Sequence, residues 1–172
     1  MTQTSVAPTI GSQILAEFEQ EAATTRRVLE RVPEGQLDWR PHPTAMTLGE
    51  LAFHVAGTPA GVTRMIQGDS MPVPTFQQPG VSSCAEILGA LEASRKAVRE
   101  SIGDAADEWL LTSWSLTRDG TPVMTLPRVA MFRMVGMNHV YHHRGQLTMY
   151  LRMLGVPVPA VYGVSRDENP FA

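Results

Sequence analysis

The sequence has little of what disulfide-bonded, membrane-spanning or secreted proteins need. It contains one cysteine in 172 residues, which excludes an intrachain disulfide. Its apolar runs are far shorter than the roughly 20 residues that a membrane-spanning helix requires. The first residues also lack a basic region followed by an apolar stretch, so we expect no secretion signal. These absences predict a soluble, cytoplasmic protein.

Charge is scarce as well. Charged residues make up 18% of the chain, and the formal net charge is only −3. Such a surface neither compensates a polyphosphate backbone nor adheres to an anionic membrane, so we expect neither nucleic acid nor a membrane as partner. With 43% hydrophobic residues, the chain is long enough to bury the core of one domain. We therefore expect a single domain over residues 1–172.

Most of the sequence has apolar residues at helical spacing. Apolar residues recur at the i, i+3, i+4 and i+7 spacing of helices that bury one face. The stretches with helical signals are residues 12–32, 48–67, 83–102 and 128–154. Thr47 and Glu50 have the spacing of a capping box, Pro59 is expected to bend the second helix, and Gly155 with Pro157 ends the fourth.

The links between these stretches are rich in proline and glycine. Residues 37–43 and 68–80 read as loops, because each proline lacks a backbone donor and the second stretch has no helical period. Asp119 and Gly120, flanked by alternating polar and apolar residues, predict a small β-hairpin near 114–124. The pattern as a whole predicts an all-α fold, a four-helix bundle with this hairpin added.

Three histidines have the positions of a metal site. His139 and His143 are four residues apart on one predicted helix, so both imidazoles can reach one ion at about 2.0–2.1 Å. His54 lies on the apolar stripe of another helix and should also face the interior. Hydrogen-bonded core histidines are the alternative, but each would then need a polar partner. Three imidazoles without a fourth protein ligand are typical of a catalytic metal site with an open position.

Other residues near this constellation have simpler explanations. His142 is adjacent to His143 and should point away from it, towards the surface or a second shell. His42 lies in a proline-rich loop. Glu50 precedes His54 by one turn and is either a catalytic carboxylate or only part of the capping box. Cys84, near a predicted helix N-terminus, is either a reactive thiol or a small buried residue.

The last predicted helix holds further polar and flexible side chains. Arg144 and Gln146 flank the ligands, and Gln146 projects on the same side as His143, where it would orient a ligand, bind substrate or satisfy buried backbone. The tyrosines read as core residues. Methionines are frequent on this helix and are expected to pack in the core or at a dimer interface.

Two segments resemble a known family. ELAFHV at 50–55 and NHVYHHRGQ at 138–146 are similar to motifs of the DinB-like (DinB/YfiT) superfamily, and the likeness extends over nearly the whole chain. The resemblance implies a four-helix bundle with a long crossover connection and metal ligands at His54, His139 and His143. It also implies a divalent ion, nickel or zinc, and a homodimer.

The resemblance leaves the function open among three hypotheses. The first is a metal-dependent transferase or isomerase that binds a low-molecular-weight thiol, since thiol-dependent S-transferases and a mycothiol-dependent maleylpyruvate isomerase are among such relatives. The second is a hydrolase in which the ion activates water. The third is a non-catalytic metal-binding stress-response protein, which the lack of an evident carboxylate base keeps open. In the first two, the partner is a small-molecule substrate.

Overall fold

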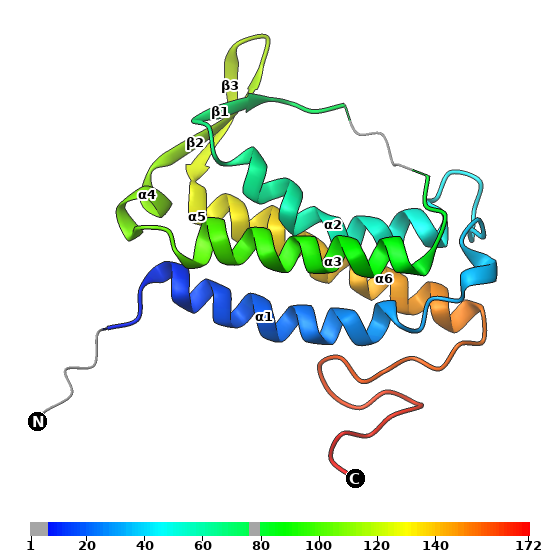
Figure 1. Ribbon diagram of the computed structural model, residues 1–172. Coiled ribbons are helices and arrows are strands. Elements are labelled where there is room, and N and C mark those ends of the chain that lie inside the picture. Colours follow the sequence, from blue (N-terminus) through cyan, green and yellow to red (C-terminus); the bar gives the residue numbers. More distant parts are fainter. Residues whose placement is uncertain (1–6, 76–79) are drawn as a thin grey trace, which may run out of the picture.

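The computed structural model describes residues 7–75 and 80–172, and this part of the chain is mostly helical with one small sheet (Figure 1). The helices are α1 (Ile10–Leu29), η1 (Glu34–Gln36), α2 (Leu48–Met65), α3 (Cys84–Val98), η2 (Arg99–Gly103), α4 (Asp107–Leu111), α5 (Arg128–Met131), η3 (Phe132–Asn138) and α6 (His139–Met153). The strands are β1 (Ser70–Pro72), β2 (Ser113–Arg118) and β3 (Thr121–Pro127). No helix in the described ranges is both long and apolar enough to cross a membrane.

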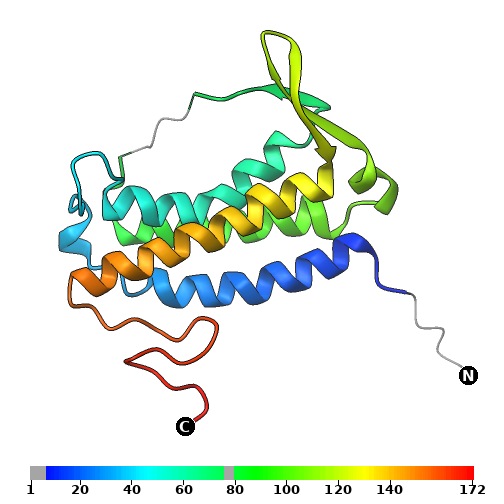
Figure 2. The ribbon, with the colours of Figure 1, turned by 180° about the vertical axis from the view of Figure 1, so that it is seen from behind.

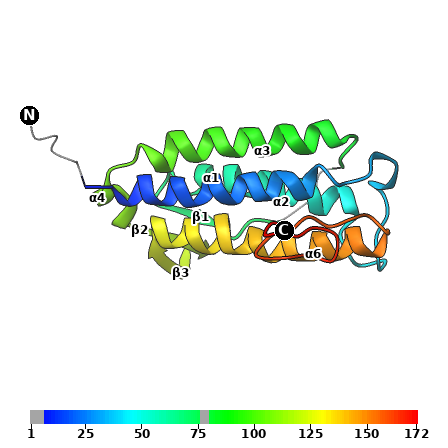
Figure 3. The ribbon, with the colours of Figure 1, turned by 90° about the horizontal axis from the view of Figure 1, so that it is seen from below.

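The long helices lie side by side, and the sheet stands at one end of them. Helix α2 contacts α3, η3 and α6, while α1 contacts α3, η2 and α6 (Figures 1 and 2). Seen from below, the axes of α3, α1 and α6 lie roughly parallel, and the chain runs along α3 in the direction opposite to α1 and α6 (Figure 3). The C-terminal tail folds back on α1, where the Arg27 guanidinium donates to the carbonyl oxygen of Ala160 at 3.2 Å and pairs with Glu168. The tail therefore covers the outer side of α1 and α6.

The helix starts follow the capping residues of the sequence. At the start of α2 the Glu50 N–H donates to Thr47 Oγ1 at 3.1 Å, and the Thr47 N–H donates to Glu50 Oε2 at 2.7 Å. The predicted capping box is thus confirmed. The Ser83 hydroxyl caps α3 by accepting from the Glu86 N–H at 3.2 Å. Pro59 lies inside α2, and the ribbon changes direction along that helix (Figure 1), as its missing backbone donor predicts.

The helix expected over 128–154 is present as an uninterrupted helical run over residues 128–153, but its hydrogen bonding changes along its length. It consists of α5, the π-helical segment η3, and α6, which begins at His139. Within η3, Gly136 leaves room for the ring of Phe132, because a Cβ at Gly136 would lie 2.8 Å from that ring. A turn of π-helix contains more residues than a turn of α-helix, but it has no apolar pattern of its own. Hydrophobic periodicity therefore does not distinguish the two.

The predicted hairpin is present in the mostly helical fold, but it is part of a three-stranded sheet. Strands β2 and β3 are antiparallel, and Asp119 and Gly120 turn the chain with φ of 51° and 78°, as the sequence predicted. The expected loop over 68–80 contains β1, which pairs parallel to β2, while its residues 76–79 lie outside the described ranges. The short helix α4 was not expected either.

A buried arginine attaches this sheet to the end of α2. The Arg128 guanidinium donates to the carbonyl oxygens of Ile66 and Gly68 at 3.0 and 2.9 Å, and it pairs with Asp69 at 2.6 Å. Its Cζ also lies 5.0 Å from the ring centre of Trp109. These bonds join Arg128, which follows β3, to the residues between α2 and β1. The sheet is therefore held beside the last turn of α2.

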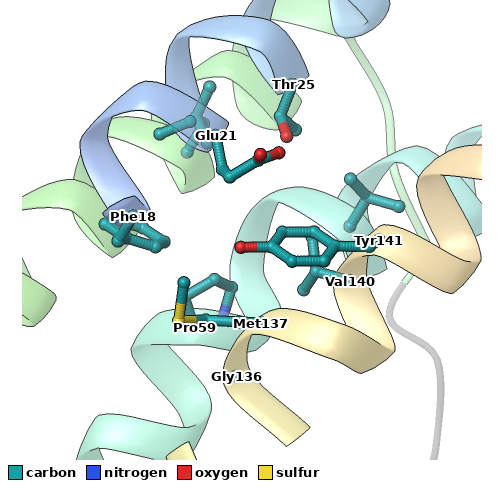
Figure 4. A pocket seen from close by; sticks show the side chains of 11 residues that line it. Phe18, Glu21, Thr25, Pro59, Gly136, Met137, Val140 and Tyr141 are labelled. Carbon is teal, nitrogen blue, oxygen red and sulfur yellow. The ribbon is translucent and has the colours of Figure 1, made fainter. Parts of the chain in front are cut away.

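A small cavity lies between α1, α2 and the junction of η3 with α6 (Figure 4). It measures about 10 Å³, close to what one buried water requires. The phenol of Tyr141 points into it near Phe18 and Pro59, and its buried oxygen has no hydrogen-bond partner in the described residues. Burial, followed by the charges of Glu21 and Glu17, raises the pKa of this phenol. The phenol of Tyr141 is thus directed into the core, as expected for the tyrosines.

Candidate metal centre

The structure brings the three predicted histidines together. Helix α2 carries His54, and the first two turns of α6 carry His139 and His143. Nε2 of His54 lies 2.9 Å from Nε2 of His139, and each ring offers a nitrogen within 4.8 Å of those of the other two. The ring centres of His139 and His143 are 4.3 Å apart, and those of His54 and His143 are 4.7 Å apart. Three nitrogens thus converge on a volume that one ion can occupy.

The surroundings keep these imidazoles neutral. Burial, followed by the nearby rings of His143 and His139, lowers the pKa of His54 to about 4. Burial is also the largest cause that lowers the pKa values of His139 and His143. A neutral ring keeps one nitrogen lone pair free, and this is the form in which histidine binds a metal.

Gln146 orients one of the rings. Its side-chain oxygen Oε1 lies 2.7 Å from Nδ1 of His143. A carbonyl oxygen can only accept, so Nδ1 of His143 carries the proton and its Nε2 is left with the lone pair. Among the roles that the sequence left open for Gln146, the structure supports the orientation of a ligand.

Replacing Gln146 by leucine is therefore expected to weaken divalent-ion binding by about 10–100-fold, the usual cost of losing an outer-shell partner. Zinc and nickel affinities of the purified variants can be measured by competition with a chromophoric chelator. Gln146→Glu is the matched control, because it keeps an acceptor oxygen for His143 Nδ1 and should retain the affinity. Equal affinities for the leucine and glutamate variants would contradict the orienting role.

The remaining polar candidates do not join the three rings. His142 is exposed on α6. His42 lies in an exposed loop, where its Nδ1 is 2.9 Å from Thr44 Oγ1. Glu50 is engaged in the capping box described above. The Arg144 guanidinium is buried on the α1 side of α6, where it pairs with Glu21.

The surroundings of Cys84 disfavour the reactive thiolate form of its side chain. Its Sγ donates to the carbonyl oxygen of Val32 at 3.3 Å, and the carboxylate of Glu34 accepts from its backbone N–H at 2.9 Å. Burial, and then the hydrogen bond and charge of Glu34, raise the pKa of the thiol to about 12. The position at the start of α3 thus favours a protonated thiol, in contrast to the reactive alternative.

We expect iodoacetamide to alkylate Cys84 at pH 8 roughly 1000-fold more slowly than free cysteine, because so little of the thiol is ionised. Mass spectrometry of the labelled chain over time gives the rate. The same chain in denaturant is the control and should react like free cysteine. Glu34→Gln should speed the reaction of the folded chain, and labelling of the native protein at the free-cysteine rate would contradict the protected thiol.

A large pocket opens beside the three rings. Its volume is about 1040 Å³, and all three histidines belong to its lining. Residues of α2, α3, η3 and β1, together with Met46 and Pro74, form the rest of the wall. Among them is Arg64, which no sequence motif singled out. A pocket of this size is large enough to enclose a small organic molecule.

Comparison with known proteins gives the family. A sequence model of the DinB family matches residues 1–169. The chain belongs to the DinB family. The uncharacterized protein YrdA of Bacillus subtilis strain 168 is 25% identical over 160 residues, which cover 90% of this chain and 89% of YrdA.

Solved structures of DinB-like proteins have the same fold. A DinB-like protein from Bacillus cereus ATCC 10987 superposes with a TM-score of 0.71 at 24% identity, covering 91% of this chain and all of that one. The DinB-like protein YjoA from Bacillus subtilis gives a TM-score of 0.64 at 18% identity, with 84% and 95% of the two chains covered. At these identities the likeness concerns the fold, and the site must be argued from this chain's own residues.

Proposed function

We propose that this DinB protein binds one divalent metal ion through His54, His139 and His143 and uses it to act on a small molecule. The observation that carries the proposal is the position of the three rings. They converge with neutral nitrogens on the wall of a large pocket. An ion held there by three protein ligands keeps a coordination position for water or substrate, as catalytic sites do.

The donor set fits a borderline transition metal. The 2.9 Å between Nε2 of His54 and Nε2 of His139 is short enough for both nitrogens to bind one ion, which these two rings would hold together with His143. A hydrogen bond between these two rings explains the same separation, but it gives no reason for the third ring to approach both. Imidazole donors suit zinc and nickel better than magnesium or calcium, so we propose zinc or nickel as the ion.

The reaction that we favour is thiol-dependent S-transfer or isomerisation. Bound there, the ion would supply Lewis acidity that keeps a low-molecular-weight thiol as its thiolate. The chain's own contribution would be to orient His143 through Gln146 and to hold the second reactant in the pocket. The apolar pocket wall would restrict water near the reacting groups.

The two other hypotheses have less support. Hydrolysis calls for a base beside the metal-bound water, but Glu50, the carboxylate considered from the sequence, already accepts the Thr47 N–H. A non-catalytic protein whose ion only stabilises the helices would have no need of a pocket of about 1040 Å³ beside that ion, whereas one that senses a small molecule would use it. We keep both as outcomes of the test.

We also propose a four-helix bundle with a long crossover, which forms a homodimer in the cytoplasm. The packing of α1 and α2 against α3 and α6 supports the bundle. The exposed side chains of Met149 and Met153 on α6, each close to 60% accessible, support the homodimer because flexible apolar side chains are frequent at interfaces.

The experiment is elemental analysis of the purified chain followed by activity assays. Zinc, nickel, iron and manganese are measured by mass spectrometry before and after metal-free dialysis. The loaded protein is then incubated with glutathione or cysteine and 1-chloro-2,4-dinitrobenzene, and with ester substrates alone. Thiol consumption that a chelator abolishes supports the transferase. Ester cleavage without thiol supports a hydrolase, and a bound ion with neither activity supports the non-catalytic alternative.

A further inference from the structure

The pocket beside the histidines has one charged side chain at a distance from them. Arg64 is in the last turn of α2, ten residues after His54, which corresponds to about 15 Å along a helix axis. Apart from the histidines, the other described lining residues are uncharged, and no carboxylate is among them. The pocket thus combines a cluster of imidazoles, an apolar body and one cation.

Arg64 has no partner in the described part of the protein. Its side chain is exposed, and its guanidinium makes no hydrogen bond or ion pair with any described residue. The buried arginines Arg128 and Arg144, by contrast, each pair with a carboxylate and also donate to neutral oxygens. A guanidinium stays charged at any physiological pH and presents a planar set of donors that fits a carboxylate. Arg64 is therefore available to a ligand.

Small residues make room between the cation and the imidazoles. Gly57 and Gly61 lie one turn apart on α2, and Ala90 and Ala93 face the same pocket from α3. A Cβ on Gly61 would meet no atom within 4 Å, so packing does not require glycine there. Glycine inside a helix costs about 1 kcal/mol relative to alanine, yet here it keeps the pocket open.

The walls of this space are apolar. Phe53 and Met65 of α2 and Met71 of β1 belong to the lining, together with Val135 of η3. Aromatic and methionine side chains adapt to the shape of an apolar ligand, whereas they offer no partner to a polar one. The lining thus favours a hydrophobic molecule over a sugar or another strongly hydrated one.

We propose that the pocket binds an elongated small molecule with an apolar body and a terminal anionic group, such as a carboxylate, held by Arg64. The opposite end of the molecule reaches His54, His139 and His143. This inference rests on the proposed function only for the role of that opposite end, because the anion site itself needs no metal.

The test uses two probes of the same shape, 6-phenylhexanoate and 6-phenylhexanamide, titrated calorimetrically into the full chain at pH 7.5. Both the metal-loaded and the chelator-treated protein are titrated, because a bound ion attracts carboxylates as well. In the chelator-treated wild type we expect the carboxylate to bind roughly tenfold or more tightly than the amide. Arg64→Gln should remove this preference and leave amide binding unchanged. The control Arg118→Gln, an exposed arginine of β2 outside the lining, should keep the preference.

A second pair of variants tests the space itself. Gly61→Phe should fill the pocket and weaken both probes by about tenfold or more. Gly89→Phe is the matched control, since Gly89 is an exposed α3 glycine that also has no neighbour within 4 Å and lies outside the lining. Circular dichroism verifies that both variants fold.

The outcomes separate the two proposals. A wild-type chain that binds neither probe, or an Arg64→Gln variant that still prefers the carboxylate, overturns the inference. If Gly61→Phe binds both probes like the wild type, the pocket assignment is also wrong. A carboxylate preference that depends on Arg64 in a chain that takes up no metal would support the inference and refute the proposed function. A tightly bound ion without any such preference would do the reverse.

Discussion

Replacing His54 by alanine should reduce the bound divalent metal from about one ion per chain to almost none, since only two protein ligands remain. His143→Ala should have the same effect. Loss of an outer-shell partner already costs 10–100-fold in affinity, so loss of a ligand should exceed about 100-fold. Elemental analysis of the purified variants after dialysis measures the content, and chelator competition measures the affinity.

His142→Ala is the matched control for these variants. His142 is adjacent to His143 on α6 and is exposed, and its nitrogen is not among those that converge. We expect this variant to keep the ion with wild-type affinity. Equal metal content in the His54, His143 and His142 variants would refute the assignment of ligands.

The same variants should differ in thermal stability when metal is added. A ligand that binds only the folded chain stabilises it by RT ln(1 + [L]/Kd), which is about 2.7 kcal/mol at 100 times Kd. Added zinc or nickel should thus raise the Tm of the wild type and of His142→Ala and leave that of His54→Ala unchanged. A rise of equal size in His54→Ala would place the stabilising ion elsewhere.

Local signals in the sequence were sufficient to predict the starts of α2 and α3 and to single out the three histidines. Thr47 and Glu50 encode a capping box within four residues, and the spacing of His139 and His143 lies within one turn, so neither depends on the rest of the fold. His54 was placed by the apolar stripe around it. The approach of His54 to within 2.9 Å of His139 comes from the packing of α2 against α6, which no local pattern specifies.

The features that the sequence did not reveal depend on contacts between distant segments. Three-residue strand β1 gains its hydrogen bonds from β2, more than 40 residues away, so its own composition gives no strand signal. In the sequence, Arg64 looks like an ordinary surface arginine. Only the packing of α2, α3 and α6 shows that it lines the large pocket. Arg144 illustrates the converse, because its position next to His143 suggested the metal site while its side chain points the other way.

Arg144 is the most extensively bonded residue between α6 and α1. Its guanidinium donates to Glu21 Oε2 at 2.7 Å, to Thr25 Oγ1 at 3.0 Å and to the Tyr162 hydroxyl at 2.6 Å. The rings of Tyr141 and Tyr162 lie 5.3 and 5.0 Å from its Cζ. Arg144 is only 1% exposed, so all of these partners lose their bond to it together if the guanidinium is removed. One side chain thus joins α6 to α1 and to the C-terminal tail.

Arg144→Met should therefore lower the free energy of unfolding by about 3–5 kcal/mol, because the largely buried carboxylate of Glu21 loses its cation. For a chain of this length the Tm should fall by roughly 10 °C. Arg133→Met is the matched control. Arg133 pairs with Glu17 of α1 at 2.8 Å, but both side chains are about half exposed, so its loss should cost under about 1 kcal/mol. Thermal denaturation followed by circular dichroism measures both.

Below its unfolding transition, Arg144→Met should still bind metal like the wild type, because the guanidinium bonds to α1 and the tail rather than to the histidines. A variant with wild-type Tm and lost metal would instead assign Arg144 to the metal centre.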